Sequence, residues 1–427
     1  MKYRKYLLGI IIIVVVFLII LISTEIIKEN KNNIEKIKEE GINLNKTLNI
    51  TKGGTYKLKG TIEDGHIYIK SNEAVRIIFE GVNITNSNGP AIIIEDAPAT
   101  TIILADDTVN NLTDGNVYKN IEFDGCINAQ DDLLIKGNGT LNINSISKRG
   151  IAAKDKLIID GGNYKIKSKE EGIKVNEQFD ILDGNIEIDS ELEGIKVSNK
   201  KDKKIGTLKV DNVELKINTL EKGISCRNKI ILNNGNIDIN AKRTGLKSKN
   251  IEINGGKLNI VAFENGIVAS GTKIYDSIEN KYYHENDAFL TINNGLIQIS
   301  SEKDGVKING IGNMNNGYLE IYTNYGLKSS CLDQDVAFNM NGGTLLAFGY
   351  NNKLKKPDQD SKQQTYIYKF DQTNDKGHLE MFNQDKLILN LEIKNKYQYI
   401  MVSTPNIKDK QDIVVKVDGK IVEIANK

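Results

Sequence analysis

The sequence predicts an all-β fold, a right-handed parallel β-helix with about three short strands in each turn of about 22 residues. Four observations support this prediction. A glycine followed by an aliphatic residue recurs through the middle of the chain, and a Gly-Gly or Gly-Asn signature followed by alternating apolar residues lies between these glycines. Proline, which interrupts strands, occurs only 4 times in 427 residues. No helical apolar period intervenes.

The repeated glycines define the turns. They are Gly150-Ile151, Gly172-Ile173, Gly194-Ile195, Gly223-Ile224, Gly245-Leu246, Gly266-Ile267, Gly305-Val306 and Gly326-Leu327. The two longest intervals contain insertions, Asn199 to Lys204 and Tyr275 to Asp287. A single turn of this size cannot bury its apolar face, so it must stack on its neighbours. Strands stacked in parallel about 4.8 Å apart form a β-helix, and parallel crossovers favour the right hand.

The direction of each side chain follows from strand alternation. The residue after the repeat glycine points inward, the second residue points outward, and the third points inward again. The outward position is a lysine in five turns, Lys174, Lys196, Lys247, Lys307 and Lys328. Cys226 takes the third, inward position, and Cys126, directly after Gly125, matches the aliphatic position. Three cysteines without CxxC spacing therefore predict buried free thiols.

The N-terminus predicts a membrane anchor over residues 1–24. Residues 7–22 are apolar apart from one glycine, and residues 6–24 approach the length that a bilayer requires. Basic residues precede this run, namely Lys2, Arg4 and Lys5. The positive-inside rule then places the bulk of the chain outside the cell as a single-pass cell-membrane protein. A cleaved signal peptide is the rival interpretation, and both interpretations predict export.

Three further segments follow the anchor. Residues 25–44 are polar with a thin apolar stripe, which predicts a stalk, either helical or unstructured. Residues 45–349 form the predicted β-helix. Residues 350–427 lose the repeat and predict a small β module that caps the open end of the solenoid. Within this module, Asp418-Gly419 between two apolar runs predicts a hairpin turn.

The lysine column has two interpretations. Ammonium groups repeated on successive turns match a linear groove for an acidic polymer such as a uronate chain. Acidic residues just before the repeat glycines favour a self-compensated charged face instead. The same carboxylates are candidate ligands for Ca²⁺, which prefers oxygen atoms, although no EF-hand or nonapeptide calcium repeat is present. The candidate metal ligands are Glu170, Glu171, Glu191, Glu193, Glu302 and Asp304.

Catalytic and nucleic-acid signatures are weak. The three histidines, His66, His284 and His378, share no motif with a serine or cysteine nucleophile. A polysaccharide lyase on this fold needs a basic residue over a bound uronate, for which Arg149 or a lysine of the column is available. A formal net charge of +1 gives no reason to expect nucleic-acid binding. The sequence specifies no oligomeric state.

Several segments carry a family resemblance. They are Ile50 to Gly60, Ile103 to Gly115 and Gln130 to Leu141, together with the repeated Gly-Ile-Lys units. In this order they resemble a bacterial family of carbohydrate-binding right-handed β-helix proteins, of the kind that binds cellulose and polygalacturonate at the clostridial cell surface and has a pectate-lyase-like fold. The resemblance covers about residues 45–349 and implies bound calcium and binding without catalysis. Arg149, Thr244 and Tyr325 replace the acid that the family pattern places directly before the glycine.

The sequence therefore predicts non-catalytic binding of a cellulosic or acidic polysaccharide at the cell surface, assisted by calcium. The main alternative is a pectate-lyase-like enzyme. A structural surface adhesin with a protein partner is the second alternative.

Overall fold

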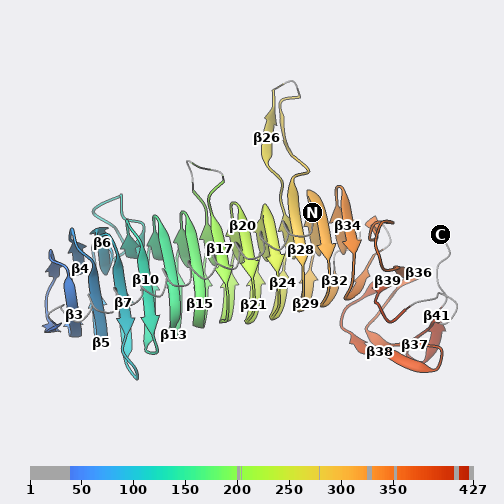
Figure 1. Cartoon of the computed structure of the whole chain (residues 1–427), viewed down its shortest axis with the longest axis horizontal. Coiled ribbons are helices and arrows are strands. Elements are labelled where there is room, and N and C mark those ends of the chain that lie inside the picture. Colours follow the sequence, from blue (N-terminus) through green and yellow to red (C-terminus); the bar gives the residue numbers. More distant parts are fainter. Residues whose placement is uncertain are drawn as a thin grey trace, which may run out of the picture.

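The computed structural model describes residues 39–422, with gaps at 200–201, 203, 278, 325–328, 351–352 and 408–412. In these residues the chain is all-β and forms an elongated solenoid of stacked strands (Figure 1). The predicted all-β class and the predicted parallel stacking are confirmed. The right-handed sense of the coil stays a prediction.

Within the described residues, one sheet of 12 strands carries the repeated Gly-aliphatic units. Neighbouring strands pair in parallel at this face, and the repeat units are in register, as in Ile173↔Ile195 and Ile195↔Ile224. The strands are β2 (Leu48–Ile50), β4 (Ile67–Lys70), β6 (Ile92–Asp96), β9 (Gly125–Ala129), β12 (Arg149–Ala153), β14 (Ile173–Val175), β16 (Ile195–Val197), β19 (Ile224–Cys226), β22 (Leu246–Ser248), β25 (Ile267–Ala269), β30 (Val306–Ile308) and β33 (Leu332–Gln334).

The second sheet contains 23 strands among the described residues and supplies the other two segments of each turn. In β13 and β15 the two segments form one long bent strand, with a register shift between Ile159 and Asn163. Its strands are β1 (Glu39–Leu44), β3 (Gly54–Ile62), β5 (Val75–Thr85), β7 (Thr100–Leu104), β8 (Val109–Thr113), β10 (Leu133–Gly137), β11 (Thr140–Ser145), β13 (Lys156–Ser168), β15 (Gln178–Ser190), β17 (Thr207–Val210), β18 (Glu214–Thr219), β20 (Lys229–Leu232), β21 (Asn236–Ala241), β23 (Asn250–Ile253), β24 (Lys257–Ala262), β28 (Ala288–Ile292), β29 (Leu296–Ser301), β31 (Gly310–Met314), β32 (Tyr318–Thr323), β34 (Ala337–Met340), β35 (Thr344–Gly349), β36 (Tyr366–Asn374) and β39 (Tyr397–Ser403).

The repeat glycine is explained by close packing between turns. A Cβ atom built on Gly172 would lie 2.3 Å from Ile188 Cγ2 and 2.7 Å from the carbonyl oxygen of Gly194. The next residue, Ile173, is fully buried in the core. Burying one such side chain stabilises the fold by about 1.5–3 kcal/mol, and the column repeats this contribution on successive turns. Glycine and isoleucine at these two positions therefore fix the spacing and the core of the solenoid together.

The three cysteines are free and buried, as predicted. Cys226 pairs in register with Val197 in the inward column. The predicted position of Cys126 is wrong by one residue, because Ile127 pairs with Ile151 in the aliphatic column. Burial raises the pKa of the Cys331 thiol to about 11, so this thiol stays protonated at neutral pH.

The predicted anchor over 1–24, including membrane contacts through residues 6–24, lies outside the described residues. In the part of the chain that the structure describes, no helix has the length and apolarity needed to span a bilayer. The predicted stalk, 25–44, ends too late, because β1 pairs in parallel with β3 and Leu44 is buried in the core. The solenoid therefore begins before residue 45.

The C-terminal residues cover the last turn. Strand β39 pairs antiparallel with β35, and β36 pairs antiparallel with β39. A separate antiparallel sheet contains β37 (Gly377–Asn383), β38 (Lys386–Ile393), β40 (Ile413–Val417) and β41 (Lys420–Val422). The ring of Phe348 stacks on Tyr322 with centroids 4.8 Å apart, in a second apolar core below the cap. Asp418 and Gly419 both have positive φ, which fits the predicted hairpin turn.

The second insertion forms a hairpin on the solenoid. Strand β26 (Lys273–Asp276) pairs antiparallel with β27 (Lys281–His284) directly after β25. Figure 1 shows this hairpin projecting beyond the edge of the stacked turns. Its base is therefore placed beside the 12-stranded sheet.

Candidate functional site

The lysine column lies on the 12-stranded sheet, as the alternation predicts, but it is interrupted. Lys174 and Lys196 are register partners on adjacent turns. Ser225 separates Lys196 from Lys247, and Val268 separates Lys247 from Lys307. Lys328 lies outside the described residues. The column is therefore not one continuous row of ammonium groups.

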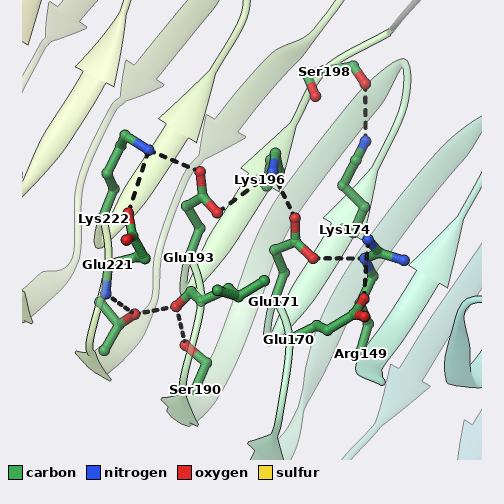
Figure 2. A network of polar contacts seen from close by, with 12 residues as sticks. Arg149, Glu170, Glu171, Lys174, Ser190, Glu193, Lys196, Ser198, Glu221 and Lys222 are labelled. Atoms are coloured by element: carbon green, nitrogen blue, oxygen red, sulfur yellow. Dashed lines mark hydrogen bonds and ion pairs between the residues drawn. The ribbon is translucent and has the colours of Figure 1, made fainter. Parts of the chain in front are cut away.

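A charge ladder runs along the corner that precedes this sheet. Each member forms an ion pair with a member on its own or a neighbouring turn. We call this set the charge ladder, and it comprises Arg149, Glu170, Glu171, Glu193, Lys196, Glu221, Lys222, Arg243, Glu264 and Lys303. Figure 2 shows its first part, with acidic and basic side chains alternating across successive strands. Most charges on the predicted charged face are thus neutralised by opposite charges of the same face.

Glu171 lies at the centre of this network. Its side chain is only 2% exposed, and its oxygens lie 2.6 Å from Arg149 Nε and 2.6 Å from Lys196 Nζ. Burial alone would raise the pKa of Glu171, but the charge of Arg149 and the hydrogen bond from Lys196 lower it below its usual range. Glu171 is therefore ionised, and its two partners have fixed positions.

Arg149 cannot easily act as a base in this environment. Burial would lower its pKa, but the nearby carboxylates of Glu171, Glu170 and Asp124 raise it further. Its guanidinium also contacts Asp124 at 3.2 Å. Of the two kinds of base that the sequence offers to a lyase, the structure thus favours a lysine of the column.

Lys247 differs from the other described lysines of its column. Lys174 donates hydrogen bonds to the carbonyl oxygens of Val175 and Ser198, and Lys307 pairs with Asp333 at 3.0 Å. The described residues offer Lys247 neither a hydrogen bond nor an ion pair. Burial lowers the pKa of Lys247, and the charges of Lys222, Arg243 and Lys273 lower it further against the opposing effect of Glu264.

The predicted calcium ligands are mostly engaged by cations. Glu170 contacts Arg149 at 3.1 Å, Glu191 pairs with Lys169, and Asp304 lies 3.3 Å from Lys353 Nζ. Glu302 accepts a hydrogen bond from Asn324 at 3.3 Å.

Across the described ranges, no three or more His, Cys, Asp and Glu side chains gather as a metal ion would require. Ca²⁺ takes six to eight oxygen ligands, so these carboxylates as arranged do not fit a resident calcium ion. Calcium binding stays a prediction.

A groove of about 570 Å³ lies beside the charge ladder, on the outward face where the second sheet ends. One row of lining side chains crosses five successive turns in register. This row consists of Asn144, Lys167, Asp189, Asn218 and Asn240. Four strand spacings of about 4.8 Å give the row a length of about 19 Å along the solenoid axis. We call this feature the amide groove.

The amide groove combines polar and apolar surfaces. The side chains of Asn144 and Asn240 are exposed and have no hydrogen-bond partner in the described residues. Ile146 and Leu220 line the groove with 40% and 56% of their surfaces exposed. Lys242, another lining residue, lies 4.7 Å from the ring centroid of exposed Phe263. Amides and apolar patches in one linear groove suit the hydroxyl groups and C–H faces of sugars.

The amide groove was not predicted from the sequence. Each residue of the groove row directly follows an isoleucine that ends an apolar-x-Ile unit, as Asp189 follows Ile188 and Asn240 follows Ile239. The signal was therefore visible as a column of polar residues, but lysine was the more regular outward column. Among the predicted site residues that the structure describes, Glu191 alone lines the groove.

Comparison with known proteins places this region in a family. The model of the carbohydrate-binding domain-containing proteins matches residues 44–277 and 221–365. The chain belongs to this family. The resemblance inferred from the sequence motifs is therefore confirmed, and the amide groove, the charge ladder and Lys247 all lie inside the matched residues.

Two proteins show the extent of similarity. A carbohydrate-binding domain-containing protein of Acetivibrio thermocellus is 40% identical over 132 residues, which cover 28% of this chain and 45% of that protein. The match thus spans less than half of the relative's length. A solved structure of a polysaccharide lyase-like protein from C. thermocellum, a gadolinium derivative, is 28% identical, with a TM-score of 0.44, over 51% of this chain and 92% of that chain.

Proposed function

We propose that this protein binds polysaccharide without cleaving it, and that the amide groove holds the sugar chain. The observation that carries the proposal is the row from Asn144 to Asn240, which runs along the solenoid axis within the family-matched region. Successive sugar units of an extended polymer meet equivalent positions on successive turns. Affinity then accumulates from several weak contacts.

The groove chemistry supports recognition of hydroxyl groups. A free carboxamide both donates and accepts hydrogen bonds, so Asn144 and Asn240 complement a sugar hydroxyl in either role. The exposed side chains of Ile146 and Leu220 offer apolar contact to the C–H faces of a pyranose ring. The lining charges, including Lys167 and Asp189, have both signs and thus allow neutral and acidic sugars.

Surface display and calcium are further parts of the proposal. The apolar segment at residues 6–24, preceded by basic residues, supports single-pass anchoring with the solenoid outside the cell. Calcium would act by joining an acidic polymer to surface carboxylates such as Glu191, which is exposed in the groove. Both parts rest on the sequence pattern.

The test is retention of the purified full chain, held in detergent micelles, on insoluble cellulose and on immobilised polygalacturonate. Each polymer is tested with calcium and with EDTA. The double variant Asn144→Ala/Asn240→Ala should weaken retention about tenfold, the loss expected for two polar contacts. Asn212→Ala, an exposed asparagine outside the groove, is the matched control. No retention of the wild type on either polymer contradicts the proposal and leaves the adhesin alternative.

A lyase is the second candidate, because Lys247 has a lowered pKa and no ion-pair partner in the described residues. A lowered pKa makes it easier for an amine to lose its own proton and then accept one from the carbon beside a uronate carboxylate. The same experiment measures unsaturated uronate in the soluble fraction. Release of product by the wild type, lost in Lys247→Ala, would establish the lyase and exclude purely non-catalytic binding.

A further inference from the structure

Lys247 has lost the two carboxylates that neutralise Lys196 at the equivalent position. Lys196 contacts Glu171, directly before the glycine of the preceding turn, and Glu193, directly before the glycine of its own turn. At Lys247 these two positions are Lys222 and Thr244. One acid is replaced by a neutral residue and the other by a cation. In the described residues Lys247 therefore forms no ion pair, although the carboxylate of Glu264 acts on it electrostatically.

The neighbour of Lys247 in the column is a hydroxyl group. Ser225 pairs in register with Lys247 on the preceding turn, one strand spacing away. Its side chain is partly exposed and has no hydrogen-bond partner in the described part of the chain. An ammonium group and a free hydroxyl side by side supply donors to the same oxyanion.

The hairpin β26–β27 is fixed next to this position. Lys249, two residues after Lys247, contacts Asp287 Oδ2 at 2.5 Å and Thr272 Oγ1 at 3.0 Å, and both of these residues flank the hairpin. Lys273 in β26 lies 4.2 Å from the ring centroid of Tyr282 and contributes to the positive potential at Lys247. The hairpin base is thereby held beside the unpaired ammonium.

The hairpin also presents exposed aromatic rings. Tyr275 and Tyr282 are 50% and 63% exposed, and their ring centroids lie 5.0 Å apart. Tyr283 is exposed as well. Tryptophan is absent from the chain, so tyrosines are its main means of stacking against a sugar ring. Rings of this exposure on a projecting hairpin bury no core and are available to a ligand.

We propose that Lys247 and Ser225 bind an oxyanion carried by a sugar, a uronate carboxylate or a sulfate ester, while the tyrosines of the β26–β27 hairpin contact the sugar ring. This inference rests on the proposed polysaccharide function and adds a second, charge-selective position to it. The amide groove holds sugars of either charge state, whereas the Lys247 site prefers acidic units. The ligand carboxylate or sulfate takes the place that Glu171 and Glu193 hold around Lys196.

The experiment measures reductive methylation of individual lysines in the full chain by mass spectrometry. The probes are trigalacturonate, a sulfated disaccharide and cellotriose, each at saturating concentration. Trigalacturonate or the sulfated disaccharide should slow labelling of Lys247 about tenfold, as expected for a charge-assisted contact. Cellotriose should leave it unchanged. If only one anionic probe protects Lys247, the site is supported, and that probe shows whether it binds a carboxylate or a sulfate. If neither anionic probe protects Lys247, the proposal is overturned.

Two variants separate binding from folding. Thr244→Glu supplies the carboxylate that the equivalent turn has at Glu193, so Lys247 becomes internally paired and the anionic probes should no longer protect it. Lys247→Arg keeps the charge and should retain binding of the anionic probe, measured by titration calorimetry. Unaltered protection in Thr244→Glu would contradict the proposal even if the probe binds elsewhere.

The two proposals fail in different ways. Retention on polymer without protection of Lys247 would overturn this site and leave the amide groove intact. Protection of Lys247 by the trisaccharide without polymer retention would overturn the groove and keep the oxyanion site.

Discussion

The turns of Lys196 and Lys247 have the same backbone and the same outward lysine but opposite electrostatic outcomes. Lys196 lies between Glu171 and Glu193 and forms part of the charge ladder. Lys247 faces Lys222 and Thr244 at the corresponding places and has no partner among the described residues. A solenoid repeats its geometry on each turn, so a change of two residues is enough to convert a structural ion pair into a free charge.

This difference separates stabilisation from recognition. A buried carboxylate such as Glu171 is tolerated because two cations and their hydrogen bonds compensate its burial. A half-buried ammonium without a counter-charge is unfavourable in the free protein and becomes favourable when an anion binds. We therefore infer that the ion pairs of the Lys196 turn stabilise the fold, whereas the Lys247 turn contacts the ligand.

The largest expected effect follows from removing the two lysines separately. Lys196→Met leaves Glu171 buried beside one cation and should lower the free energy of unfolding by about 2–4 kcal/mol, between the values for surface and buried pairs. Lys247→Met removes a charge that has no ion-pair partner, and it should raise the free energy of unfolding slightly, by about 0.5 kcal/mol. Chemical denaturation followed by circular dichroism measures both. Equal losses in the two variants would remove the distinction between the turns.

Acid should affect the two turns differently. The folded-state pKa values of Glu171 and Glu193 are lowered, because their cationic partners outweigh the effect of burial. Their stabilisation is therefore complete above the ordinary glutamate value of 4.5 and is lost as pH falls through the lower folded value. Hydrogen exchange at β14 and β16 should accelerate in this range more than exchange at β22. Uniform acceleration along the solenoid would contradict the assignment.

Thr244→Glu should make the second turn resemble the first. The new carboxylate lies three residues before Lys247, as Glu193 lies before Lys196, and should raise the pKa of Lys247. The gain in unfolding free energy should reach about 1 kcal/mol at most, because the lysine is partly exposed. The pH dependence of methylation at Lys247 reports the shift. An unchanged labelling profile would show that the two turns are not equivalent.

The smallest effect is expected at the hairpin. Tyr282→Ala removes an exposed ring, so it should leave the unfolding free energy within about 0.5 kcal/mol of the wild type. It should weaken the binding of trigalacturonate several-fold in calorimetry, because a stacking contact is lost. Tyr118→Phe, a buried tyrosine far from the hairpin in sequence, serves as a control that leaves affinity unchanged.

The fold was largely predictable because its main signal is local. Alternation of apolar and polar residues after each repeat glycine determines which side chains are buried, and Ile173 and Lys174 follow the rule. Cys126 does not follow the prediction, because the strand before the first clear repeat is displaced by one residue in register. The start of the solenoid was placed too late because β1, although it contains Gly41-Ile42, belongs to the 23-stranded sheet and is identified by its pairing with β3.

The site was less predictable because its contacts cross turns. Lys196 pairs with Glu171, 25 residues earlier, and this choice of partner depends on strand register. The sequence showed both charges but not which turns would be compensated. The amide groove arises from side chains such as Asn144 and Asn240 that align only after several turns have stacked. Alternation alone gives the direction of each side chain and leaves its neighbours undetermined.

The most direct test of polysaccharide binding is a retention experiment on cellulose and polygalacturonate with three forms of the full chain, the wild type, Asn144→Ala/Asn240→Ala and Thr244→Glu. We predict that the wild type binds both polymers and that the groove variant loses affinity for both. Thr244→Glu should lose only the additional, salt-sensitive affinity for polygalacturonate. Absence of wild-type retention on both polymers would contradict the account.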